Sequence, residues 1–331
     1  MTIDISTIKY DVELITETGG RYLLNDALLD LQWEEQKGEL AQRATISVAN
    51  FLIGNTYLMA LAKLNCILQI SSDWGEGKKL LFDGTIWEWK YKSATNKELS
   101  LISYDRMIRL QQSKDFKYYS AGMTTQALVN SICSDWGIPV AYKWGQSITH
   151  EKKVFSADTI SDMIFSLLEE VRKKTGEGYI AYFRDNQLQI VGYGSNSTVY
   201  RFDGQNVIST TDKLTLNNLV TRVKVIGKQD NEGRAAVEAL VDGDTRFGVL
   251  QEIIRRDSDK KLDSAMSEAN ALIKERGKPE ETIQLQTVDL PFLRKGDKAE
   301  IAAGNLLGFF FVEGVAHYAT AKQMELTLLR V

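Results

Sequence analysis

The sequence has few of the residues on which most catalytic and metal sites depend. Its 331 residues include two histidines, two cysteines and three prolines. A zinc site needs several clustered Cys or His ligands, and a Ser-His-Asp triad needs an imidazole beside its serine. His150 falls in a polar loop and His317 in an expected strand, each without a second His or a Cys at ligand spacing. We therefore expect no catalytic, metal-binding or cofactor-binding residues, and two structural or solvent-exposed histidines.

Long hydrophobic runs are also missing. No run of about 18 apolar residues occurs, so no membrane span is expected. The first five residues lack a basic segment and an apolar core, so we expect no signal peptide. Cys66 and Cys133 lie in apolar surroundings, which favours two buried free thiols over a disulfide. These features fit folding in a reducing cytoplasm.

The charge is balanced rather than basic. Lys and Arg total 40 against 44 Asp and Glu, giving a net charge of -4, and this excludes a broad basic field for nucleic acid. With 44% hydrophobic and 25% charged residues, the composition is typical of a globular protein, and the length allows two or three domains.

Acidic residues occur in pairs that have a simple structural interpretation. Glycosidases hold two carboxylates apart across a cleft, which the neighbours Glu34-Glu35, Glu169-Glu170 and Glu280-Glu281 do not predict. Glu169 and Glu170 are expected to pair with lysines one helical turn later. Asp242-Gly243-Asp244 lacks the rest of a calcium loop and predicts a tight turn.

The first hundred residues are dominated by alternation with a period of two, which is typical of half-buried strands. Strands are expected at 9–16, 27–33, 44–49, 64–71, 80–92 and 98–103. Their spacing predicts a small barrel or sandwich that closes near residue 103. Trp87, Trp89 and Tyr91 alternate with charged residues. They could pack the sheet, form a protein interface or make a platform for sugars.

The next hundred residues change to a helical period. After a polar loop, Thr124 is placed to cap a helix that ends at Gly137. A second helix is predicted from Thr159 to Lys174, followed by Gly176, with an apolar face that includes Leu168. A hairpin over Asp185-Asn186 follows, so this region is expected to be an α+β unit.

The last third returns to strands. Strands are expected at 218–227, 234–240, 283–288, 298–302, 307–317 and 323–329, with one helix at 262–276. The run at 306–312, Leu-Leu-Gly-Phe-Phe-Phe-Val, is apolar on both strand faces. It predicts burial by its own domain on one side and by a neighbouring subunit or domain on the other.

The order of these elements carries a resemblance that covers most of the chain. Its features are the strand with Asp83-Gly84, a strand ending in Ser103-Tyr104-Asp105, a helical knob at 106–110, and the Thr-headed helix ending near Trp136-Gly137. It resembles the late control protein D family of baseplate hub proteins in contractile phage tails, in its XkdQ/YqbQ-like form. The resemblance implies an α+β, mostly β fold. Two strand-rich barrel-like tube domains, 1–103 and 206–331, the second with one helix, would flank a central α+β domain, 104–205.

The function implied by the resemblance is structural rather than enzymatic. Such a hub forms a homotrimeric ring that adapts the sixfold tail tube to the threefold spike. Its partners are its own copies, the spike protein, the tail tube or a tube-adaptor protein, and baseplate wedge proteins. It assembles in the bacterial cytoplasm and is released within the particle by lysis. On this hypothesis Phe310→Lys, within the apolar run, should stop baseplate assembly. The alternative hypothesis is a carbohydrate-active enzyme or cell-wall-binding module that uses the aromatic strands and a carboxylate pair.

Overall fold

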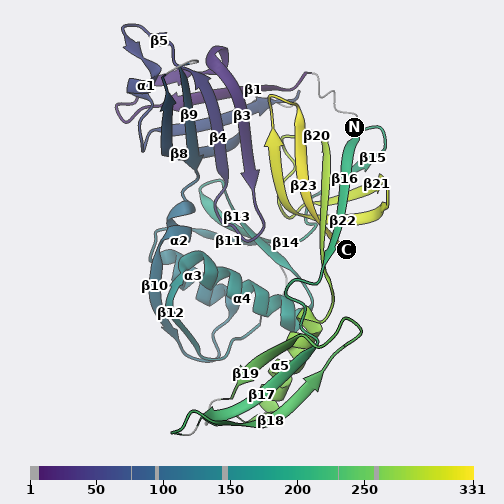
Figure 1. The fold of residues 1–331 in the computed structure, drawn as a ribbon. Helices are drawn as coiled ribbons and strands as arrows, with labels where there is room; N and C mark the ends of the chain where they lie inside the picture. Colours follow the sequence, from purple (N-terminus) through teal and green to yellow (C-terminus); the bar gives the residue numbers. More distant parts are fainter. Residues whose placement is uncertain (1–6, 76, 94–96, 144–147, 230, 257–260) are drawn as a thin grey trace. The chain divides into compact units, whose positions relative to one another are not determined.

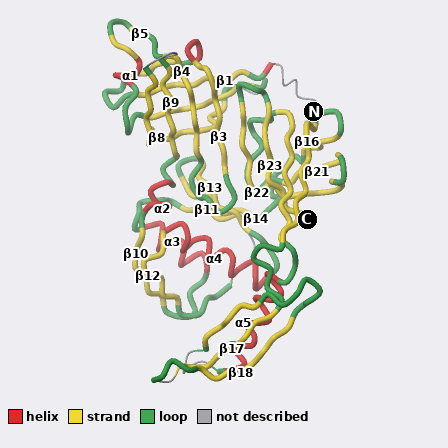
Figure 2. Tube along the Cα trace, in the orientation of Figure 1, coloured by secondary structure: helices red, strands yellow, loops and turns green. Residues whose placement is uncertain are grey.

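The computed structural model describes residues 7–75, 77–93, 97–143, 148–229, 231–256 and 261–331. It confirms the predicted class, an α+β fold made mostly of strands. Two compact units are present, one comprising the chain up to Thr210 together with Gln284–Val331, and the other Thr211–Ile283. Figures 1 and 2 draw the course of the chain, and each unit is described by itself.

The N-terminal part of the first unit is an antiparallel sheet. Its strands are β1 (Lys9–Ile15), β2 (Arg21–Leu23), β3 (Leu28–Glu35), β4 (Arg43–Ala49), β7 (Ile67–Asp73), β8 (Lys79–Lys92) and β9 (Glu98–Tyr104). The short elements η2 (Asn25–Ala27), β5 (Leu52–Ile53), β6 (Thr56–Tyr57) and α1 (Leu58–Leu61) connect them. Alternate residues such as Val12, Ile46 and Phe82 point into one buried core, as the period of two predicts.

The C-terminal strands of the chain continue this sheet. They are β15 (Tyr200–Asp203), β16 (Val207–Thr215), β20 (Glu280–Val288), β21 (Lys298–Ala303), β22 (Leu306–Tyr318) and β23 (Gln323–Arg330). Strand β22 pairs with β3, and His317 lies opposite Trp33. The strand order is therefore β16-β20-β23-β22-β3-β4-β9-β8-β7-β1-β2, with β21 on β22 and β15 on β21. Strands from the two ends of the chain, differently coloured in Figure 1, thus share one sheet.

The central region carries the long helices of the first unit, drawn red in Figure 2. It contains α2 (Ile108–Gln112), β10 (Lys114–Tyr119), α3 (Thr125–Ser134), β11 (Val140–Lys143), β12 (Lys153–Thr159), α4 (Ile160–Thr175), β13 (Tyr179–Arg184) and β14 (Gln187–Gly192). The predicted caps are present, since the Thr124 hydroxyl accepts from the Ala127 amide and the Thr159 hydroxyl from the Asp162 amide. The antiparallel ribbon of β10 and β12 was not predicted, because β10 lies in the stretch that was expected to be a polar loop.

The second unit has its own small core. It consists of β17 (Arg222–Gln229), β18 (Ala235–Asp242), β19 (Gln251–Arg255) and α5 (Leu262–Arg276), with strand order β18-β17-β19. Helix α5 buries Ala265 and Ala269 against Val223 and Val225. The sequence placed these elements inside one C-terminal domain, 206–331, whereas 211–283 is compact by itself because α5 covers this small sheet. The boundaries at 103/104 and 205/206 stay a proposal.

Candidate assembly interface

The apolar run at 306–312 is half buried and half exposed within the chain. Leu306, Phe310 and Val312 point into the core, and Phe310 is only 1% exposed. Leu307 and Phe309, on the opposite face of β22, are 72% and 48% exposed. The predicted burial by its own domain therefore holds for one face only. The other face is exposed in the single chain.

The exposed side of β22 belongs to a larger apolar surface. We call it the β22–β23 patch, and it consists of Leu307, Phe309, Phe311, Leu329 and Val331. Phe311 lies opposite Leu329, and the Val331 amide donates to the Phe309 carbonyl at 3.3 Å, so the two strands place these side chains together. Apolar surfaces that stay exposed and contiguous commonly mark interaction sites.

Charged and aromatic groups border the patch. The Lys298 ammonium lies 4.4 Å from the centroid of the Phe309 ring, and Tyr193 packs on Phe311 with 5.3 Å between ring centroids. A cation over an aromatic face is attracted by the ring quadrupole, so Phe309 is held in place although it is exposed. The patch is thus an ordered surface that a partner could bury without first having to fix its side chains.

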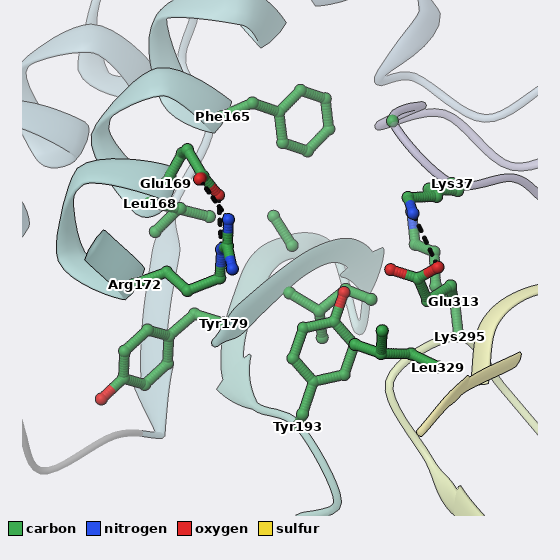
Figure 3. A pocket seen from close by; sticks show the side chains of 13 residues that line it. Lys37, Phe165, Leu168, Glu169, Arg172, Tyr179, Tyr193, Lys295, Glu313 and Leu329 are labelled. Carbon is green, nitrogen blue, oxygen red and sulfur yellow. Dashed lines mark hydrogen bonds and ion pairs between the residues drawn. The ribbon is translucent and has the colours of Figure 1, made fainter. Parts of the chain in front are cut away.

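A pocket of about 410 Å³ adjoins the patch, since Leu329 of the patch and Tyr193, which packs on Phe311, both belong to its lining. Figure 3 shows Glu169 and Arg172 of α4 on one side and Lys37 with Glu313 on the other. The Arg172 guanidinium donates two hydrogen bonds to Glu169, and the Lys37 ammonium lies 2.7 Å from the Glu313 carboxylate.

Because these charges are already paired, the pocket offers a partner mainly its apolar lining. Phe165, Leu168 and Leu329 belong to that lining. Such a pocket suits an apolar side chain of a protein partner better than a reacting substrate.

A buried ionic network lies near the end of β3. The Arg294 guanidinium donates to both carboxylate oxygens of Glu35, with Nε at 3.0 Å, and the Lys295 amide donates to the same carboxylate at 3.2 Å. Burial alone raises the pKa of Glu35, but attraction to Arg294 and its hydrogen bonds outweigh burial and hold the pKa at about 2. The Lys295 ammonium donates to the carbonyl of Glu39 at 2.6 Å.

Asp105 is a second buried acid, at the start of the central region. Its carboxylate accepts the amides of Met107 at 2.9 Å and Gln42 at 3.2 Å. Burial raises its pKa to about 7 despite these hydrogen bonds. Glu35 therefore links the end of β3 to the 294–295 loop. Asp105 links Gln42, in the turn before β4, to the start of the central region. Their role in this geometry is structural.

Both histidines are buried and hydrogen bonded. His317 stacks on Trp33 with 4.5 Å between ring centroids, and its Nδ1 lies 2.7 Å from Asp289. His150 lies between Thr125, 2.7 Å from Nε2, and Glu170, 2.9 Å from Nδ1.

The Thr125–His150–Glu170 chain has the residue types of a hydrolytic triad but not its accessibility. Thr125 and His150 are almost fully buried, so no substrate can approach the hydroxyl. Within the described parts of the chain, no cluster of three or more His, Cys, Asp or Glu side chains is arranged to hold a metal ion.

Two of the three acidic pairs, Glu34-Glu35 and Glu169-Glu170, are engaged in ion pairs. Glu170 pairs with Lys174 at 2.8 Å, as the helical spacing predicted. Glu34 binds Arg43 while Glu35 binds Arg294, so the two neighbouring acids serve different partners.

The acids of the Asp242-Gly243-Asp244 turn also form ordinary ion pairs. Asp242 and Asp244 bind Arg222 and Arg246, respectively. Cys66 and Cys133 are free and buried.

The aromatic strand forms a second exposed surface. Trp87 and Trp89 are 46% and 36% exposed, and the register of β8 against β9 shifts at Trp87. Of the three strand aromatics, Tyr91 packs against the core, whereas the two tryptophans remain largely outside it. Phe82 and Ile86 of the same strand occupy the core instead. The tryptophans line a cavity of about 660 Å³ together with Leu64 and Met59.

Among solved structures, phage tail proteins share this fold. A tail protein from Neisseria meningitidis MC58 has a TM-score of 0.68 at 13% identity, covering 96% of both chains. The 43 kDa tail protein of prophage MuSo2 from Shewanella oneidensis also has a TM-score of 0.68, at 11% identity, covering 97% of this chain and 98% of its own. The fold is thus that of phage tail proteins.

The family follows from the sequence comparisons. The family model described as YQBQ-like matches residues 69–329, so the chain belongs to the YqbQ-like family. The uncharacterized protein YqbQ of Bacillus subtilis (strain 168) is 24% identical over 229 residues, which cover 65% of this chain and 69% of YqbQ. The resemblance predicted from the sequence is confirmed at this level. Among the described residues, no helix has the length and apolar character needed to cross a membrane.

Proposed function

We propose that this protein is the structural hub of a contractile-tail baseplate, in a phage, a prophage-like element or a phage-tail-like bacteriocin. Three copies form a ring between the sixfold tail tube and the threefold spike. The family and fold support this role, and the single observation that carries it is the exposed β22–β23 patch, on the face of β22 opposite its buried residues. The function is mechanical and needs no catalytic group.

The sheet gives a physical reason for a ring. Its path ends at β2 and β16, and strand edges that stay open are prone to unwanted pairing. A closed cyclic assembly covers such edges and buries exposed apolar surface. Each chain contributes strands from both of its ends through the β3–β22 pairing, so three chains supply six strand-rich parts around one axis. The other partners in this proposal are the spike protein, the tube or a tube-adaptor protein, and wedge proteins. The protein would assemble in the bacterial cytoplasm and reach the released particle by lysis.

The position of Phe310 corrects the experiment that the sequence indicated. Phe310→Lys was expected to stop assembly, but Phe310 is buried in its own core, so the substitution would damage folding first. The residue that tests the interface is its exposed neighbour Phe309. We expect Phe309→Lys to leave the melting temperature nearly unchanged and to prevent incorporation into baseplates.

The matched control is Phe116→Lys. Phe116 is 65% exposed and lies on β10, away from the patch. Its replacement by lysine makes the same chemical change as Phe309→Lys. Cryo-electron microscopy of particles, or of the protein with its spike, should show three copies around the axis for the wild type and for this control. One copy, six copies or a peripheral location contradicts the hub role. Normal assembly of Phe309→Lys contradicts the role of the patch.

The enzymatic alternative finds less support. It needs two carboxylates facing each other across a cleft, but Glu35 and Glu170 are each bound by cations. The second candidate function is cell-wall binding through the exposed Trp87 and Trp89, since aromatic rings pack against sugars. Cleavage of peptidoglycan that is lost on replacing two carboxylates would favour the enzyme. Binding that is lost in Trp89→Ala would favour the binding module.

A further inference from the structure

A cavity of about 660 Å³ shares no lining residue with the β22–β23 patch and differs from it in character. It is enclosed by the 195–198 loop after β14, by the 292–297 loop and by residues at the ends of β7, β11 and β13. Its lining combines aromatic rings, hydroxyl groups and cations, whereas the pocket of Figure 3 has its charges paired and its remaining lining apolar. The proposed hub role does not use it.

One wall of the cavity is aromatic. The rings of Trp74 and Phe292 have centroids 5.2 Å apart, and those of Tyr200 and Phe292 5.0 Å apart. These rings come from three separate segments of the chain, so the fold itself assembles the cluster. An aromatic wall beside polar groups suits a ligand with one apolar and one hydrogen-bonding face.

Another part of the lining is polar and held in a fixed conformation. Asn196 donates to the Lys298 carbonyl at 2.9 Å and accepts the Lys298 amide at 2.7 Å. The Gly194 amide donates to the Gly296 carbonyl at 2.8 Å. The hydroxyls of Ser195, Ser197 and Thr198 are thus carried by an anchored loop. Such a loop loses little conformational freedom when a ligand binds.

The lining carries excess positive charge. Lys143 and Arg184 form no ion pair with any part of the chain that the structure describes, and Arg294 is neutralised by Glu35. Asp297 is the lining carboxyl, and one of its oxygens accepts the Arg294 amide at 2.9 Å. Burial raises the pKa of Asp297 to about 6, although the charges of Arg294 and Arg184 act to lower it. With Lys143 and Arg184 against the single carboxyl of Asp297, the lining keeps a net positive charge, which favours an anionic ligand.

We propose that this cavity binds an anionic saccharide, a sugar ring that carries a carboxylate or a phosphate. The ring packs on Trp74 and Phe292, and its hydroxyls exchange hydrogen bonds with the anchored loop. Arg184 and Lys143 hold the anionic group, since charge-assisted hydrogen bonds to carboxylate or phosphate are the strong ones. The cavity has the size of ordinary small-ligand sites, which span about 300–1,000 Å³.

Isothermal titration calorimetry on the full chain tests the chemistry of the ligand. The probes are glucuronic acid and glucose 6-phosphate, with glucose and inorganic phosphate as comparisons. We expect saturable binding of at least one anionic sugar, about tenfold tighter than of glucose or phosphate, and weaker at high salt. No binding of either anionic sugar overturns the proposal. Equal binding of glucose rules out the anionic part, and equal binding of phosphate rules out the sugar part.

Two variants test the location. Arg184→Gln and Trp74→Leu should each weaken binding of the anionic sugar about tenfold or more, while the melting temperature stays near that of the wild type. Lys79→Gln, an exposed cation on β8, is the matched control and should bind normally. Unchanged binding in both cavity variants shows that the site lies elsewhere. Because neither residue belongs to the β22–β23 patch, both variants should still assemble, so this proposal and the hub role fail independently.

Discussion

Glu35→Gln removes one charge from the buried ionic network while keeping the size of the side chain. Glu35 is 4% exposed and receives two hydrogen bonds from Arg294 and one from the Lys295 amide. The substitution takes away the carboxylate that binds the largely buried Arg294 guanidinium at two points. An uncompensated buried charge is costly, so we expect a large loss of stability.

Two independent arguments give the size of this loss. A tenfold change in proton affinity corresponds to ~1.4 kcal/mol, so a pKa of about 2 instead of the ordinary 4.5 corresponds to ~3 kcal/mol. Breaking a buried ion pair by removing one partner costs about 3–5 kcal/mol in other proteins. We therefore expect Glu35→Gln to lower the free energy of unfolding by ~3 kcal/mol.

The assay is urea unfolding at pH 7 with a matched control. Glu13 forms the same two-point ion pair with Arg21, but that pair lies at the surface, where water screens it. Glu13→Gln should therefore shift the unfolding midpoint far less. Equal shifts for the two variants would refute the argument that burial makes the Glu35 pair strong.

The effect of Glu35 should also depend on pH. The pKa of this carboxyl is lower in the folded chain than in the unfolded chain, so its stabilising contribution is complete above about pH 4.5. It is lost as the pH falls towards 2. The difference between wild type and Glu35→Gln should be constant from pH 7 to pH 5 and shrink below that. A difference that grows in acid would contradict the assignment.

The remaining predictions concern the central region. Leu168→Asp should give unfolded or insoluble protein, because it buries an unpaired charge on the apolar face of α4, and normal yield and melting temperature would contradict this. Burial raises the pKa of Asp105 to about 7, so the contribution of this carboxyl to the free energy of unfolding is largest below about pH 4 and declines as the pH rises to 7. NMR titration of the Asp105 carboxyl should show a midpoint near 7. Thr159→Ala removes the N-cap of α4 and should cost about 1 kcal/mol in urea unfolding, whereas the neighbouring Asp158→Ala should cost less.

Local features of the fold could be predicted from the sequence because they depend on residues close together in the chain. Helix α4 begins at the Thr159 cap and ends at Gly176, which has a φ of 80°. The hairpin of β13 and β14 turns through Asp185 and Asn186, both in the left-handed region. The mostly β class and the family resemblance followed from the order of such elements.

The candidate interface could be predicted only in part. The apolar run at 306–312 indicated a contact surface, but its pattern did not say which face of β22 the chain itself would cover. That depends on the pairing of β22 with β21, β23 and β3, which places Phe310 inside and Phe309 outside. The exposure of Trp87 and Trp89 could not be predicted for the same reason. A one-residue shift in the register of β8 at Trp87 decides which side of the sheet a residue faces.

The sequence by itself determined the local elements, the small number of histidines and cysteines, and the class of fold. Only the tertiary structure decided which residues contact one another across the chain. Glu35 and Arg294 are 259 residues apart in the chain, and β3 meets β22 across a similar separation. Such contacts form because the whole sheet selects one register that buries its apolar face, and no local pattern contains that choice.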